Sequence, residues 1–174
     1  AMAWTNVMLT APDQLRQRMA WALQQHLVVG VPGLARKKEH GCFFAYHDIM
    51  ARHAHGSYGA LLKEVAFAPI MGEYLTHKEN KAQAYSGSYP DENFAREIMQ
   101  LFTIGLWQLN PDGTRKTTTA ADQQGAPIPT YSNEDITAFA RVWTGFDFQP
   151  SRANMEAKEG LSSHNSVDTM QIKP

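Results

Sequence analysis

The stretch DENFAREIMQLFTIG, residues 91–105, has the pattern of a helix with a defined start and stop. Pro90 and Asp91 favour a start, because proline's fixed φ suits a first turn and a carboxylate is attracted to the positive helix end. Gly105 favours a stop, since glycine readily adopts the left-handed conformation that closes a helix. Apolar side chains cover most of the circumference. We therefore predict that the helix from Asn93 to Ile104 is central to its domain.

A narrow polar stripe runs along this helix, because Asn93, Arg96, Glu97 and Gln100 recur at spacings of three and four residues. Glu92 and Arg96 stand four residues apart in the order that favours an ion pair. Such a pair contributes about 0.2–0.5 kcal/mol when it is exposed.

Glu97 has no opposite charge four residues further on, so a partner has to come from another element, and Arg141 is the candidate. Two interpretations stay open. In the first, which we favour, the stripe is a structural network that binds the central helix to the last one; its members are Glu92, Asn93, Arg96, Glu97 and Arg141. In the second, Glu97 is a general acid or base in a cleft, with Arg96 and His26 as further catalytic candidates.

Towards the N-terminus, Thr10 to Asp13 resemble a capping box, which predicts a helix that runs to about Val29. One face of this helix is apolar and is expected to be buried; it carries Leu15, Met19, Ala22, Leu23 and His26. We interpret His26 as a core histidine that hydrogen-bonds a backbone carbonyl, in preference to a ligand or a base.

The remaining periodicity predicts four more helices. These are residues 39–55, a helix capped by Ser57 that runs through Val65, residues 70–75, and a final helix that Ser132 caps and Gly145 ends. Residues 76–89 are polar and read as an exposed loop, while two turn signals within residues 106–131 indicate a β-hairpin. The expected fold is therefore all-α, with about six helices and a small hairpin insertion. We predict a single domain over residues 1–150 and an irregular tail over residues 151–174.

Composition excludes several classes of function. The chain has 174 residues, of which 43% are hydrophobic and 19% charged, and its formal net charge is −1. This net charge gives no reason to expect nucleic acid or an anionic membrane as a partner, since both are attracted to basic surfaces. No apolar run approaches the roughly 18 residues of a membrane span. The lone Cys42 cannot form an internal disulfide and is expected to be an inert buried thiol.

Neither a metal site nor a cofactor is expected. The seven histidines include no pair four residues apart on a helix and no His-Glu-x-x-His motif. The chain also contains no Gly-x-Ser-x-Gly, no phosphate-binding loop and no dinucleotide fingerprint.

Taken together, five blocks resemble the bacterial domain-of-unknown-function 1800 family: PDENFAREIMQLFTIG, APDQLRQRMAWAL, GSYGALLKEVAFAPIMGEYL, LNPDGT and YSNEDITAFARVWTGF. The resemblance covers nearly the whole chain in order, and VDTMQIKP is similar to the start of a further family segment. It implies a largely helical fold, a fragment of a longer protein, and export to the periplasm, cell envelope or exterior. The resemblance implies no particular activity, because the family has none assigned.

The expected function is thus a non-enzymatic interaction or scaffold module of an exported protein, whose partner is another protein or the remainder of its own longer chain. The alternative is a hydrolase-like enzyme that uses Glu97, with His26 or His53, beside the central helix.

Overall fold

The computed structural model describes residues 2–31, 34, 40–120, 124–152 and 165–173. The fold is predominantly helical with a small β element, as predicted. The chain divides into two compact units: unit 1 comprises residues 1–79 and 145–174, and unit 2 comprises residues 80–144. The single domain over residues 1–150 stays a prediction.

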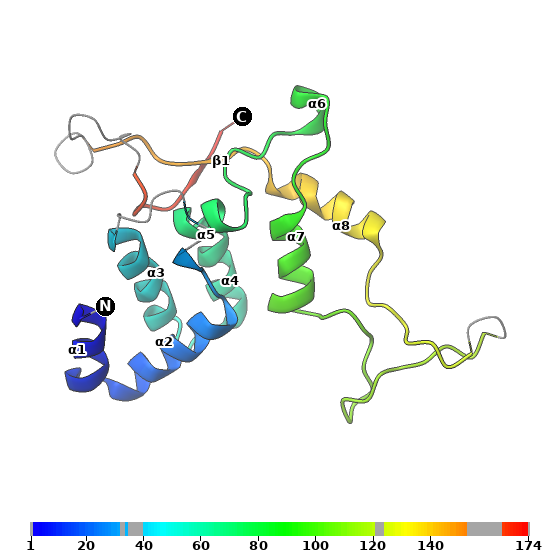
Figure 1. Ribbon diagram of the computed structural model, residues 1–174, viewed down its shortest axis with the longest axis horizontal. Coiled ribbons are helices and arrows are strands. Elements are labelled where there is room, and N and C mark those ends of the chain that lie inside the picture. The colour runs from blue at the N-terminus through cyan, green and yellow to red at the C-terminus, as the bar shows by residue number, and fades with distance from the viewer. Residues whose placement is uncertain (1, 32–33, 35–39, 121–123, 153–164, 174) are drawn as a thin grey trace. The chain divides into compact units, whose positions relative to one another are not determined.

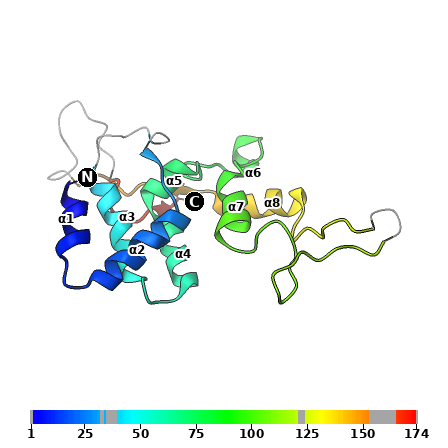
Figure 2. The same ribbon diagram turned by 60° about the horizontal axis from the view of Figure 1, so that its bottom comes forward.

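Unit 1 contains five helices among its described residues (Figure 1): α1 (Met2–Thr10), α2 (Gln14–His26), α3 (His40–Arg52), α4 (Tyr58–Phe67) and α5 (Pro69–Tyr74). Helix α3 packs against α2, α4 and α5, and the two views in Figures 1 and 2 show α2 alongside α3. Ser57 caps α4 as predicted, because its hydroxyl accepts a hydrogen bond from the backbone N–H of Ala60. The predicted first residue of α3, Glu39, lies outside the described residues.

The predicted start of α2 is wrong. Thr10 is the last residue of α1, a helix that the sequence did not indicate, and its hydroxyl donates to the carbonyl of Asn6 rather than capping α2. Asp13 occupies the N-cap position of α2 without a side-chain capping bond.

The predicted orientation of α2 is also wrong, because its apolar stripe faces solvent. Leu15 is 71% exposed and Met19 39%, and His26 is exposed as well, so His26 is not a core histidine. The helix instead turns polar side chains towards α3: the Arg16 guanidinium donates to the carbonyl of Ala51 at 2.8 Å. Two glutamines of α2 contact His47 of α3 in the same interface.

The C-terminal residues complete the core of unit 1. Strand β1 (Phe146–Asp147) pairs antiparallel with β2 (Gln171–Ile172), and the backbone N–H of Met170 donates to the carbonyl of Phe67 at 2.8 Å. Phe146 and Met170 are both buried. Residues 165–173 of the predicted irregular tail thus form an ordered part of unit 1, while residues 153–164 and 174 lie outside the described residues.

Unit 2 is built around α7 (Asn93–Glu97) and α8 (Asn133–Ala140), which pack against each other. Their interface buries Ala95, Ile136 and Ala140. The unit also contains the short α6 (Gln83–Ser86), within the predicted loop, and a 3-10 turn at Arg141–Trp143. The capping box that starts α8 is formed by Ser132 and Asp135.

The central helix differs in detail from its prediction. It starts at Asn93, as predicted, and the Asp91 carboxylate accepts a hydrogen bond from the N–H of Asn93 at 2.8 Å. After Glu97 the backbone continues as a π-helix over Ile98–Phe102. Gly105 has the expected left-handed φ of 74°. Because a π-helix has more residues per turn, the predicted polar stripe keeps its register only as far as Glu97.

The hairpin predicted at residues 106–131 is present as three antiparallel bridges: Trp107–Pro129, Leu109–Arg115 and Thr117–Pro127. The first turn closes through a hydrogen bond from the N–H of Gly113 to the carbonyl of Asn110. Residues 121–123 of the second turn lie outside the described residues.

Candidate functional site

A polar cluster of unit 2 contains two of the residues that the sequence singled out, Glu92 and Arg96. Arg96 and Glu92 form the ion pair expected from their spacing, with Nη2 and Oε2 at 3.2 Å. The other oxygen of Glu92 accepts a hydrogen bond of 2.7 Å from the hydroxyl of Thr137 on α8. Glu92, one of the five residues assigned to the polar network, thus links the start of α7 to α8.

Glu97 is not part of this link. Its Oε2 atom is buried and has no hydrogen-bond partner, and Glu97 makes no ion pair with Arg141 in the described part of unit 2. Arg141 is exposed, and it lines a separate cavity of about 280 Å³ beside Pro90 and Thr144. The charge of Glu97 is therefore left without a direct protein partner.

A second buried polar atom of unit 2 belongs to Tyr131, the residue before the cap of α8. Its hydroxyl is buried and has no hydrogen-bond partner, while the ring packs against the α7–α8 core. Burial raises the pKa of Tyr131; the positive charge of Arg96 opposes this rise and the negative charge of Glu97 adds to it. Tyr131 therefore lies in the electrostatic field of both α7 residues.

The backbone directly after Glu97 is unusual as well. The π-helix begins directly after Glu97, and the hydroxyl of Thr103 donates to the carbonyl of Ile98 at 2.6 Å. Short π segments within helices occur frequently at functional sites. A buried carboxylate and a buried phenol beside such a segment have the residue types needed to accept and donate a proton.

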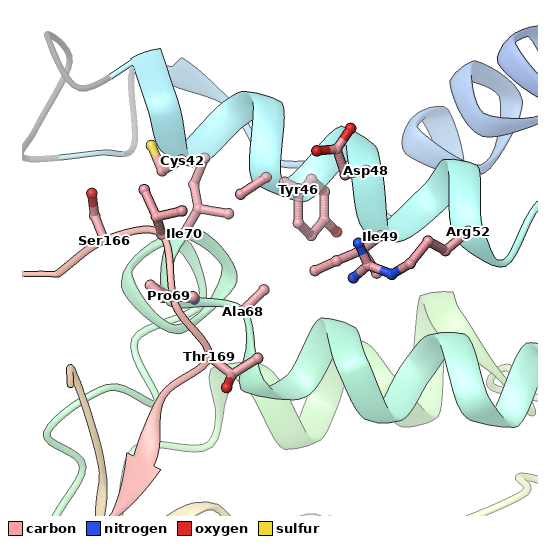
Figure 3. A pocket seen from close by; sticks show the side chains of 12 residues that line it. Cys42, Tyr46, Asp48, Ile49, Arg52, Ala68, Pro69, Ile70, Ser166 and Thr169 are labelled. Carbon is pink, nitrogen blue, oxygen red and sulfur yellow. The ribbon is translucent and has the colours of Figure 1, made fainter.

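Unit 1 contains a second candidate, a cavity of about 150 Å³ shown in Figure 3. Helix α3 contributes one wall, the junction of α4 and α5 a second, and the segment before β2 a third. The lining residues are Cys42, Ala45, Tyr46, Asp48, Ile49, Arg52, Ala68, Pro69, Ile70, Ser166, Val167 and Thr169. Cys42 is buried, as the sequence predicted.

The charged groups at this cavity are partly neutralised. Arg52 and His53 both contact the carboxylate of Glu64, at 2.6 and 2.9 Å. Burial raises the pKa of Glu64, but the hydrogen bonds from His53 and Arg52 outweigh it, so the pKa is lowered overall. The Tyr46 hydroxyl donates to the carbonyl of Leu27 at 2.8 Å, and its burial raises its pKa far above the ordinary value. Tyr46 is therefore a neutral structural group.

The third wall of the cavity is a built turn. The side-chain oxygen of Asn165, a residue only 1% exposed, accepts hydrogen bonds from the N–H groups of Val167 and Asp168. Its amide nitrogen donates to the Asp168 carboxylate at 2.6 Å. The sequence analysis missed this turn, because it lies in the segment that shows no periodicity.

The histidines and the helix-start asparagine contribute little to either candidate. His26 and His53 belong to unit 1, whereas Glu97 belongs to unit 2. Asn93 is exposed at the start of α7. The sequence analysis did not single out Tyr131 and Thr137. Both lie in the block YSNEDITAFARVWTGF, but nothing in its spacing marks them as polar partners of the central helix.

Within the described residues, the structure has neither a cluster of metal ligands nor a membrane-spanning helix. No group of three or more His, Cys, Asp or Glu side chains in the described ranges lies close enough together to hold a metal ion. None of the helices in those ranges is both long and apolar enough to span a membrane.

Comparison with known proteins gives one match. The model of the family described as "Protein of unknown function (DUF1800)" matches residues 1–171. No curated protein and no solved structure matches the chain. Since the match covers nearly all of the sequence, the chain belongs to the DUF1800 family.

Proposed function

We propose that this chain is an interaction or scaffold module of an exported protein, and that the outward face of α2 is its binding surface. The observation that carries the proposal is the inverted packing of this helix. Leu15, Met19 and Ala22 recur on one face at spacings of four and three residues, and all three are exposed. A helix with polar side chains inside and an apolar stripe outside is stabilised when a partner covers the stripe.

Other large apolar side chains of this part of unit 1 are exposed as well. They are Val7 and Leu9 of α1, Trp21 of α2, and Val28. Residues 2–31 include only three charged side chains, and two of these, Asp13 and Arg16, contact each other at 3.9 Å. The partner is therefore a protein with a complementary apolar surface rather than a highly charged molecule.

The test replaces the stripe without disturbing the α2–α3 contact. The double variant Leu15→Glu/Met19→Glu places two charges on the exposed face, and Gln25→Glu is the matched control, because Gln25 is exposed on the same helix. A partner is captured by a photoreactive residue at position 15, identified, purified and titrated against the chain. Self-association is measured in parallel by light scattering.

We expect the double variant to weaken the measured interaction by at least about tenfold, since burying a Leu or Met side chain contributes about 1.5–3 kcal/mol. The control should bind like the unmodified chain. Binding that is equal in both variants, or the absence of any purified partner and of self-association, would reject the α2 surface.

A second candidate function is a hydrolase-like enzyme in which Glu97 is the acid or base. The buried, unbonded Oε2 of Glu97 supports it, because a buried carboxylate without a partner is costly to the fold and is found where function requires it. The test is a screen of ester, amide, glycoside and phosphoester substrates with Glu97→Gln alongside. Activity that survives this replacement would show that Glu97 is not the acid or base.

Export rests on the family resemblance alone, and cell fractionation of a producing bacterium tests it. Recovery of the full-length protein in the cytoplasm only would contradict this part of the proposal.

A further inference from the structure

The cavity of about 150 Å³ in unit 1 is lined by buried aliphatic residues and by exposed charged ones. Ile49 is 6% exposed, Ala68 2% and Ile70 4%, and these residues form an apolar floor. Asp48 and Arg52 of α3 line the same cavity and are exposed, so they lie at its rim. An apolar cavity with a few polar groups is the usual form of a small-molecule site. Cavities of this volume hold ligands of about six non-hydrogen atoms.

The segment before β2 adds two hydroxyl groups to the lining, those of Ser166 and Thr169 (Figure 3). This wall has a defined shape, because the buried side chain of Asn165 accepts hydrogen bonds from the N–H groups of Val167 and Asp168. A hydroxyl oxygen can accept a hydrogen bond from a ligand, as a carboxylate oxygen can. The cavity therefore has hydrogen-bond acceptors on two of its walls, α3 and this segment.

The charge at the rim depends on which carboxylate Arg52 contacts. Arg52 stands four residues after Asp48 on α3, a spacing that favours an ion pair between them. The structure pairs Arg52 with Glu64 of α4 instead, with Nη2 and Oε2 at 2.6 Å. Asp48 forms no ion pair with any of the residues that the structure describes. Because Glu64 neutralises Arg52, Asp48 gives the rim of the cavity a net negative charge.

This charge and the apolar floor together restrict the class of ligand. An anion would be repelled by Asp48, and Arg52 is already bound to a carboxylate. A wholly apolar ligand would remove polar lining groups from water without replacing their hydrogen bonds. A protonated alkylamine meets both requirements. Its ammonium group has three N–H donors for the carboxylate and hydroxyl oxygens, and its aliphatic chain can cover the floor.

We propose that this cavity binds a protonated primary alkylamine, with the ammonium group at Asp48 and the aliphatic chain against Ile49 and Ile70. The alkylammonium group belongs either to a free amine or to a lysine side chain of another protein. No residue of α2 lines the cavity, so this site is separate from the α2 surface and goes beyond the proposed interaction function. Either proposal can fail without the other.

Binding is measured by NMR on the full chain, with the δ1 methyl groups of isoleucine labelled. Ile49→Val and Ile70→Val assign the two signals of the floor. Butylammonium chloride is the probe, and butyrate and 1-butanol test a similar chain without the positive charge. Asp48→Asn removes the carboxylate charge with little change in shape. Asp13→Asn is the matched control, because Asp13 is an exposed carboxylate of unit 1 that does not line the cavity.

We expect butylammonium to shift both methyl signals saturably. Asp48→Asn should weaken this binding by at least about tenfold, the effect of losing one hydrogen bond to a charged group. Asp13→Asn should bind like the unmodified chain. Equal binding of butyrate or 1-butanol, equal binding by Asp48→Asn, or the absence of a saturable shift would overturn the site.

A second titration distinguishes the two sources of the amine. Nα-acetyl-lysine methylamide presents the same ammonium group on a lysine side chain. Binding that is tighter than that of butylammonium would support a lysine of another protein as the ligand, because the added backbone groups then make favourable contacts. Binding that is no tighter would support a free amine.

Discussion

The side-chain oxygen of Gln17 lies 3.0 Å from Nε2 of His47, and this partly buried contact joins α2 to α3. The amide nitrogen of Gln17 donates to the carboxylate of Asp13 at 3.1 Å, which fixes the direction of its oxygen. Nε2 of His47 therefore carries a hydrogen. Nδ1 lies 3.2 Å from the side-chain oxygen of Gln24. Turning this amide by 180° would present its NH₂ group to Nδ1 instead, because the oxygen and nitrogen of an amide have nearly the same shape.

This geometry predicts the tautomer of His47. At pH 8 the neutral ring should carry its hydrogen on Nε2, because Nδ1 is the nitrogen that can accept from the Gln24 amide. Two-dimensional ¹⁵N NMR of the imidazole distinguishes the two tautomers directly. Gln17→Leu removes the oxygen that sets the tautomer and should populate both forms. A ring with its hydrogen on Nδ1 in the unmodified chain would contradict the contact.

His47 also predicts how stability depends on pH. Burial lowers the pKa of His47 below its ordinary value of 6.5, although the Asp48 carboxylate works in the opposite direction. The unfolded chain therefore binds this proton first as the pH falls. The stability that the buried, neutral His47 contributes is present in full above pH 6.5. It is lost as the pH falls from 6.5 towards the pKa of His47 in the folded protein. Urea unfolding between pH 8 and 5 should show a larger loss for the unmodified chain than for His47→Gln. Equal losses would contradict this prediction.

Gly145→Ala should destabilise unit 1. Gly145 has a φ of 82°, and a Cβ atom there would lie 2.7 Å from the carbonyl oxygen of Lys173. The backbone strain alone costs about 1–2 kcal/mol, and the contact adds the displacement of β2 from β1. Gly113→Ala is the matched control, since it has a φ of 83° with nothing within 4 Å. Chemical unfolding should show a clearly larger loss for Gly145→Ala; equal losses would mean that β2 moves aside freely.

Asn165→Ala should loosen the turn that forms one wall of the 150 Å³ cavity. The N–H groups of Val167 and Asp168 lose their acceptor, which costs about 1–3 kcal/mol where they stay buried. Ser166→Ala, in the same turn, should cost much less. Hydrogen exchange at Val167 and Asp168 gives a local measurement. Unchanged exchange in Asn165→Ala would show that the turn holds without this side chain.

Ser132→Ala should fray the start of α8. The Ser132 hydroxyl bonds to the N–H of Asp135, and the loss of such a cap costs about 0.5–2 kcal/mol. The Asp135 carboxylate in turn accepts from Ser132, and these hydrogen bonds lower the pKa of Asp135. Ser132→Thr preserves the cap and is the control. Faster hydrogen exchange at residues 134–136 in the alanine variant alone is the expected result, and equal exchange in both variants would contradict it.

The sequence predicted the helical fold class, most helix positions and the hairpin, because these depend on local signals. Ser57 and Ser132 cap helices with their hydroxyl groups, and Gly105 adopts the left-handed conformation that glycine permits. These preferences are local and do not depend on the surroundings.

The failures have a common physical cause. Periodicity predicts which face of a helix is apolar, and it assumes that the apolar face points inward. In α2 the apolar face points outward, because Arg16 and the two glutamines have specific partners on α3. The same limit applies to the candidate site: burial of single atoms in Glu97 and Tyr131 depends on tertiary packing, which no spacing along the chain encodes.

The division of unit 1 into two sequence segments has a consequence for how the protein is made. Residues 80–144 interrupt unit 1, yet the flanking residues meet in it, since the N–H of Glu79 donates to the carbonyl of Phe146 at 2.7 Å. During synthesis, α1 to α5 leave the ribosome long before Met170 and β2, which fill part of their core. Closing that long loop is slow and costs chain entropy. We therefore expect α1 to α5 to stay in an incomplete, chaperone-dependent state until Met170 and β2 have been synthesised.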